Sequence, residues 1–115
     1  MRVNSDLPEA WMPSGPGAQR RILCQDKDLM MVEFAFEKEG EGLPHSHPHI
    51  QTTMVTSGQF RFTVAGVTKT LNPGDAMVIP SNAEHSCVCL KEGRLVDSFA
   101  PRRDDFMQAH GLPLD

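Results

Sequence analysis

Large apolar residues occupy every second position in several short stretches of this chain. From Met30 to Phe36 the even-numbered residues are apolar, and residues 59–64 alternate in the same way. A period of two is typical of a β-strand with one buried face, and residues 52–56 add a run rich in β-branched side chains. Turn residues recur about every eight to twelve positions between such runs. The pattern predicts an all-β fold, a small barrel or jelly roll.

The expected strands are short, and a single helix follows them. They span residues 20–24, 29–36, 52–56, 59–64, 67–71, 76–80, 86–90 and 94–99, with a short C-terminal helix at 104–109. Ser57-Gly58 is expected to close a hairpin. Residues 1–18 are rich in proline and glycine, which predicts an irregular N-terminal arm with Trp11 as a packing anchor, followed by one domain over residues 19–115.

The charge pattern argues against a nucleic-acid surface. The chain has 115 residues and a formal net charge of −4, and its longest basic runs are the pairs Arg20-Arg21 and Arg102-Arg103. A single domain of this size that also encloses a ligand site buries a modest core. We therefore expect two chains to associate as a homodimer.

Hydropathy and cysteine content indicate the cellular compartment in which the protein is expected. Apolar runs are only a few residues long, and residues 1–17 are not a basic start followed by an apolar segment. No signal peptide or membrane-spanning segment is predicted, so we expect a cytoplasmic protein without a membrane partner. Cys24, Cys87 and Cys89 are odd in number and too few for a disulfide framework, which fits a reducing compartment.

A histidine-rich segment carries the clearest chemistry. His45, His47 and Gln51 share the parity of one strand face, and His85 lies downstream in a turn between two expected strands. Three imidazole nitrogens and one amide oxygen suit one divalent transition metal ion, Ni²⁺, Fe²⁺, Mn²⁺, Co²⁺ or Zn²⁺. Four ligands leave two octahedral positions for a bidentate substrate. Because all four are neutral, the site stays dicationic and favours anions. The alternative is a set of surface histidines in a polar loop.

The remaining histidines and two of the cysteines are not expected to bind the metal directly. His49 is expected at the rim of the site or behind its ligands, because Pro48 makes its direction variable. His110, in the C-terminal tail, is expected to be solvated. Cys87 and Cys89 share the parity of His85, but buried cysteines are more often apolar fillers than ligands or nucleophiles.

A second constellation follows in the last expected strand. Asp97 and Phe99 face the same way there. If that face is the interior, Asp97 is a buried carboxylate near a dication and is either a paired structural group or an acid/base catalyst. Arg103 either reaches back to pair with a substrate carboxylate or is an exposed charge on the final helix.

The two histidine-bearing segments resemble the two sequence motifs of the cupin superfamily. The matching residues are His45, His47, Gln51 and Gly58 in the first motif and Gly74, Pro80, Asn82 and His85 in the second. Gln51 stands where the first motif usually has an acidic ligand, and Asn82 stands where the second motif has its second glycine. The resemblance implies a single-domain cupin and leaves its function open, because the superfamily spans binding proteins, isomerases, dioxygenases and decarboxylases.

A narrower likeness covers about residues 21–106. The segments 29–33, 45–49, 87–90 and 97–106 look like those of the pectin-degradation cupins called KdgF. That family converts 4,5-unsaturated monouronates, released from pectin or alginate by lyases, to linear keto forms. The likeness implies that His45, His47, Gln51 and His85 bind the metal. It also implies active-site roles for Asp97, Phe99 and Arg103.

The expected function is therefore metal-dependent ring opening and tautomerisation of a small unsaturated uronate. Two other functions stay open. One is a non-catalytic cupin that only binds a sugar or metabolite. The other is a metal-dependent dioxygenase, against which the neutral ligand Gln51 counts modestly, because iron oxygenases often use an anionic one.

Overall fold

The computed structural model describes residues 1, 3–4 and 10–114. Within them the chain forms strands and one short helix, which confirms the predicted all-β fold with a C-terminal helix. The elements are β1 (Met12–Gly15), β2 (Ala18–Asp26), β3 (Leu29–Phe36), β4 (Glu41–His45), β5 (Ile50–Val64), β6 (Val67–Leu71), β7 (Ala76–Ile79), β8 (His85–Ala100) and α1 (Asp104–Ala109).

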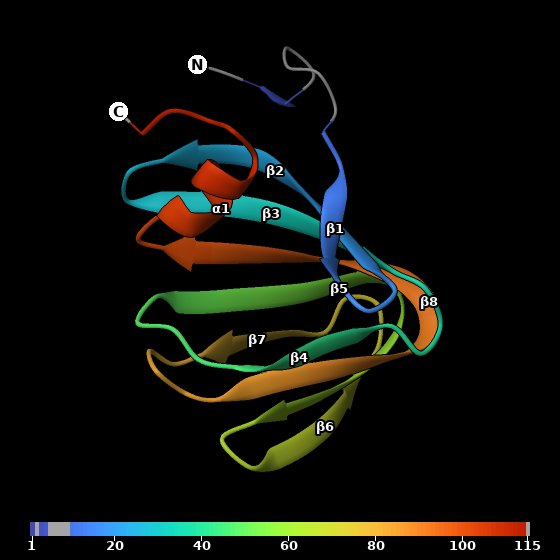
Figure 1. Cartoon of the computed structure of the whole chain (residues 1–115). Coiled ribbons are helices and arrows are strands. Elements are labelled where there is room, and N and C mark those ends of the chain that lie inside the picture. The colour runs from blue at the N-terminus through green and yellow to red at the C-terminus, as the bar shows by residue number, and fades with distance from the viewer. Residues whose placement is uncertain (2, 5–9, 115) are drawn as a thin grey trace.

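Two long strands, β5 and β8, hold the fold together. The sheet runs in the order β1-β2-β3-β8-β5-β6, with β4 added on β8 and β7 added on β5. The first half of β5 pairs with the second half of β8 and with β7, while its second half pairs with the first half of β8 and with β6. Figure 1 shows β8 curving from one layer of strands to the other. Both layers therefore share these two strands and enclose one interior.

The predicted hairpin at Ser57-Gly58 is wrong, because β5 continues through it. The β5–β8 pairing changes register three times between Val55 and Phe60, and Gly58 has φ +77°. These irregularities bend the strand without reversing it. Gly93 lies opposite in β8, where an added Cβ would collide with Ser57 O. Two glycines at the crossing thus allow both backbones to approach closely and bend together.

The N-terminal arm is more ordered than predicted. Residues 12–15 form β1, which pairs with β2, and β2 begins at Ala18 inside the stretch expected to be irregular. Pro13 fits there because β1 is an edge strand, where a missing N–H is tolerated. The Trp11 ring lies 5.0 Å from the Arg21 guanidinium carbon, in keeping with a packing anchor. Residues 2 and 5–9 of the arm lie outside the described residues.

The apolar core follows the predicted alternation. Met30 and Val32 are fully buried on one parity of β3, and Phe36 is nearly so. Helix α1 packs Phe106 and Met107 against the end of this core. In the part of the chain that the structure describes, no helix has the length and apolarity needed to cross a membrane.

Candidate metal centre

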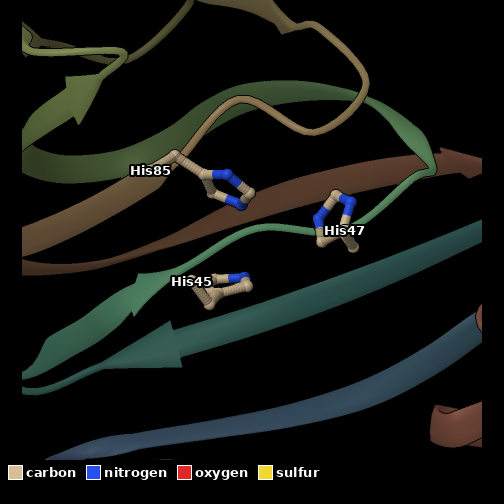
Figure 2. A group of neighbouring side chains, drawn as sticks. All are labelled: His45, His47 and His85. Carbon is tan, nitrogen blue, oxygen red and sulfur yellow. The ribbon is translucent and has the colours of Figure 1, made fainter.

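Three of the predicted ligands converge at one end of the interior. His45 ends β4, His47 lies in the following loop and His85 begins β8. One ring nitrogen from each lies within 4.8 Å of the others, and Figure 2 shows the three rings around a common space. The β4–β8 pairing sets His45 opposite His85, which explains why residues forty positions apart meet.

The three imidazoles are oriented by backbone carbonyls. Each Nδ1 bonds to a carbonyl oxygen two residues away, which fixes the ring and its tautomer. The bonds are His45 to Leu43 O (2.7 Å), His47 to His49 O (3.0 Å) and His85 to Ala83 O (2.9 Å). Because a carbonyl oxygen only accepts, each Nδ1 carries the proton and each Nε2 keeps a lone pair. Each Nε2 atom can therefore donate its lone pair to a metal ion.

Gln51 completes the donor set. Its Nε2 donates to Thr53 Oγ1 at 3.0 Å, and its Oε1 lies 3.0 Å from His47 Nε2. Two acceptor atoms therefore face each other, and burial followed by the charge of Arg103 lowers the pKa of His47, which disfavours a proton between them. Two ligands at about 2.1 Å from one ion and at right angles to each other would be about 3.0 Å apart. The pair fits adjacent positions on a metal.

His85 provides a second observation that fits a bound cation. Its Nε2 is buried and has no hydrogen-bond partner among the described residues. Burial is the main cause that lowers the pKa of His85 to about 4, so the ring is neutral near pH 7 and its lone pair is available. Three such nitrogens and one amide oxygen fit a divalent transition metal ion, whose identity the donor set leaves open.

The histidine cluster opens into a cavity of about 290 Å³. His45, Gln51 and His85 line it together with Asp97 and Phe99. Ligand sites in proteins are commonly about 300–1,000 Å³, so this volume suits one small molecule and not a polymer.

Asp97 and Phe99 face the same way, as the parity of their strand predicts, and the structure shows that this face is the interior. Asp97 is 7% exposed, and Thr53 Oγ1 donates to its Oδ1 at 2.6 Å. Burial raises the pKa of Asp97 to about 7, while hydrogen bonds from Thr53 and Gln51 and the charge of Arg103 act in the opposite direction. A carboxyl group with such a pKa can both accept and release a proton near neutrality.

Arg103 is buried directly before α1, so the alternative of an exposed charge is wrong. Its Nε and Nη2 donate to the two oxygens of Asp105, at 2.9 and 2.8 Å, and this pairing lowers the pKa of Asp105. The guanidinium carbon lies 5.0 Å from the Phe99 ring centroid and 4.0 Å from that of Phe106. Arg103 and Phe99 thus form one wall of the cavity.

The secondary histidines and cysteines have mixed outcomes. His49 lies behind the ligands, as expected, since its carbonyl orients His47. His110 is half-buried, and Arg20 Nε donates to its Nε2 at 3.3 Å. The expectation of a solvated side chain is therefore wrong. Cys87 is buried in the core, and burial raises the pKa of its thiol to about 12, in agreement with a packing role.

Asn82 takes the backbone shape that glycine would supply. Its φ is +65°, a region that asparagine tolerates better than most residues. Its N–H donates to His47 O at 2.8 Å. The departure from the second cupin motif is thus explained by conformation, and the turn still anchors the loop that carries His47.

The sequence alone did not single out Ser14, Arg20 and Thr53. Ser14 and Arg20 line the cavity, and Thr53 links Gln51 to Asp97. Arg20 shares the inward parity of Ala18 on β2, but Ala18 lies in the stretch expected to be irregular, so this parity is visible only in the structure. No sequence signal marks Ser14 either.

The fold and the histidine cluster define a cupin, and the comparisons agree. The Cupin domain family matches residues 32–98. The pectin degradation protein KdgF of Dickeya dadantii (strain 3937) is 39% identical over 107 residues, which cover 91% of this chain and 96% of that protein. The chain therefore belongs to the cupin domain family and, within it, to the family of KdgF.

Solved structures give the same result. The structure of KdgF from Halomonas sp. superposes with a TM-score of 0.82 and 37% identity, covering 90% of this chain and 94% of that one. An RmlC-like cupin from Shewanella frigidimarina NCIMB 400 gives a TM-score of 0.83 and 37% identity, covering 86% and 89%. Both structures therefore share the fold of this protein over most of both chains.

Proposed function

We propose that this protein converts 4,5-unsaturated monouronates, from pectin or alginate breakdown, to linear keto-uronates by ring opening and tautomerisation. One divalent metal ion would be held by His45, His47, Gln51 and His85. The observation that carries the proposal is the opening of this donor cluster into a small cavity that also contains a buried, protonatable carboxyl group, Asp97. The 39% identity to the pectin degradation protein KdgF supports the choice of substrate.

The reaction is an isomerisation, so no atom is gained or lost. The substrate has a carboxylate conjugated to a C4–C5 double bond, with the ring oxygen on C5 and a hemiacetal at C1. A proton leaves the C1 hydroxyl, the C1–ring oxygen bond breaks, and a proton reaches C4 as C5 becomes a ketone. A bound dication would stabilise negative charge on the oxygen at C5, because its four protein ligands are neutral.

Asp97 is proposed to move at least one of these protons. Its carboxyl group is buried and lines the cavity, where it can exchange a proton with a bound substrate. Thr53 donates a hydrogen bond to one of the Asp97 carboxyl oxygens, and this contact fixes the orientation of the whole carboxyl group. Phe99 is proposed to supply an apolar wall against the sugar ring, and Arg103, whose guanidinium carbon lies 5.0 Å from the centroid of the Phe99 ring, is proposed to hold the wall in position.

The test is an ultraviolet assay of the conjugated alkene. Purified protein is incubated with lyase-made unsaturated monouronates, with and without a chelator, and then with each candidate metal restored. We expect the absorbance to fall only with metal present. Tight uronate binding without loss of absorbance would instead support the binding-only cupin, and substrate-dependent oxygen uptake would support the dioxygenase.

A further inference from the structure

Arg20 is an inward-facing cation that forms no ion pair with a carboxylate in the part of the chain that the structure describes. It lies on β2, lines the cavity and is opposite Phe34 on β3. Its Nε lies 3.3 Å from His110 Nε2, and its Nη2 lies 3.9 Å from Met12 Sδ. Both partners are neutral when His110 is unprotonated, and among the described residues no carboxylate oxygen lies within 4.0 Å of Arg20.

The second arginine of the cavity differs in this respect. Arg103 has two of its nitrogens bound to Asp105, so that ion pair already compensates its charge. The guanidinium carbons of Arg20 and Arg103 lie 3.9 and 4.0 Å from the centroid of the same Phe106 ring, which holds both in place. Arg20 is thus preorganised and partly desolvated, and it makes no close ion pair among the described residues. Burial followed by the charge of Arg103 lowers its pKa, and the carboxylate of Asp105, which is held by Arg103, offsets only part of this effect. A planar guanidinium in that state binds a carboxylate well.

Ser14 adds an unpaired hydroxyl to the same cavity. It lies in β1, where the register shifts between Pro13 and Gly15, so it is the extra residue of a β-bulge. Such bulges redirect a side chain relative to a regular strand. Ser14 lines the cavity with Arg20, and its Oγ is buried without a hydrogen-bond partner in the described part of the chain. A buried hydroxyl needs a partner, and the cavity is where one can bind.

We propose that Arg20 and Ser14 form a sugar-binding subsite in which Arg20 binds the carboxylate of the uronate and Ser14 forms a hydrogen bond with one of its hydroxyl groups. This subsite selects acidic sugars over neutral ones. This inference rests on the proposed function only in taking a uronate as the ligand. Arg103 then positions the aromatic wall, while Arg20 makes the charge-specific contact.

The test uses saturated sugars, so that binding is measured without reaction. Zinc-loaded full-length protein is titrated calorimetrically with galacturonate and with galactose, which lacks the carboxylate. We expect galacturonate to bind more tightly. Arg20→Gln should weaken galacturonate binding about tenfold or more and leave galactose binding unchanged, as expected for the loss of one charge-assisted hydrogen-bonding group. Ser14→Ala should weaken both sugars by a similar, smaller factor.

Two further variants keep the result interpretable. Arg20→Lys retains the cation without the planar fork, so it should keep part of the acid preference. Arg21→Gln is the matched control, because Arg21 lies on the other face of β2 and pairs with Glu33 at 2.8 Å. It should bind both sugars like the wild type. Thermal melts establish that each variant is folded.

The outcomes separate this inference from the proposed function. Equal binding of both sugars by the wild type, or unchanged galacturonate binding by folded Arg20→Gln, overturns the inference. If the wild type also consumes the alkene substrate, the proposed function survives that result. If Arg20→Gln loses acid preference while the wild type leaves the alkene intact, the inference stands and the proposed function fails.

Discussion

Asp97 is the residue on which the proposed chemistry depends most directly. Asp97→Asn keeps the size of the side chain and an acceptor for Thr53 but cannot exchange a proton. We expect turnover of unsaturated uronates to fall about 10²–10⁴-fold, the usual contribution of an acid/base group, while metal content stays at the wild-type level. Steady-state kinetics and metal analysis measure the two. Unchanged turnover would remove Asp97 from the mechanism.

The raised pKa of Asp97 also predicts a pH dependence of stability. The carboxyl group titrates at about 7 in the folded protein and near 3.8 when unfolded. Between these values the folded state holds the proton and the unfolded state has lost it, so this group lowers the free energy of unfolding as pH rises, by about 1.4 kcal/mol per pH unit at most. His85, with a lowered pKa, acts in the opposite sense between about pH 4 and 6.5.

The difference between two proteins isolates the effect of Asp97. Urea unfolding of metal-free wild type and Asp97→Asn is compared from pH 4 to 7. Metal is removed because a dication beside the carboxylate would itself lower the pKa. The wild type should lose stability relative to the variant as pH rises. A constant difference across this range would mean that Asp97 ionises normally.

Residue types and spacing revealed the reactive groups but not what holds them. His45, His47 and Gln51 were recognisable because ligand chemistry and parity coincide in a few residues. Thr53 was not, because a threonine in a strand is common and its bond to Asp97 joins residues 44 positions apart. Arg20 was not, because its charge contradicts the apolar parity of β2. Only tertiary structure shows which such contradictions line a cavity.

At the scale of elements, Gly58 permits the bend of β5. An added Cβ at this position would collide with Lys91 O, Glu92 O and the Gly93 backbone, and its φ is positive. Gly58→Ala should therefore destabilise the protein by about 3 kcal/mol or more, beyond the cost of strained backbone alone. Urea denaturation measures the loss.

Gly66 provides the matched control for that variant. It also has a positive φ, +81°, but a Cβ there meets nothing within 4 Å. Gly66→Ala should cost only about 1–2 kcal/mol, the penalty for a strained residue. If the two variants lose the same stability, crowding at the strand crossing is unimportant and only backbone conformation matters.

The same feature explains why strand lengths could not be predicted. Serine followed by glycine is a common turn signal, and nothing local distinguishes a turn from a bend. The distinction lies in the pairing of β5 with β8, which continues on both sides of Gly58. The alternation within each half was predictable, because burial of one face acts on every second residue regardless of how the halves join.

For the whole molecule, the homodimer remains a prediction, and one face offers a location. The outward side chains Met31 on β3, Met54 on β5 and Val78 on β7 are 38%, 44% and 58% exposed. Met31 and Val78 lie in one row across the sheet, with the uncharged Ser98 and Thr52 between them. The row of Met54 continues through Val96 to the charged Glu33, so the uncharged part of this face is the row of Met31 and Val78. An apolar row of this kind is typical of the centre of an interface between identical chains.

A charge at the centre of this face should separate the chains. Val78→Glu is expected to change the light-scattering mass from two chains to one without loss of the fold. Val67→Glu is the control, because Val67 is equally exposed but lies on β6 in the other layer. A wild type with the mass of one chain, or a Val78→Glu variant that remains paired, would contradict the prediction.

The continuity of β5 and β8 through both layers has a consequence for re-engineering the chain. New termini opened at Ser57-Gly58 would cut one of the two strands that tie the layers together and would divide the half of β5 that carries Gln51 from the half that pairs with β6. New termini at Ala65-Gly66, in the β5–β6 turn, would leave both long strands whole. A circular permutant should therefore tolerate the second position and not the first.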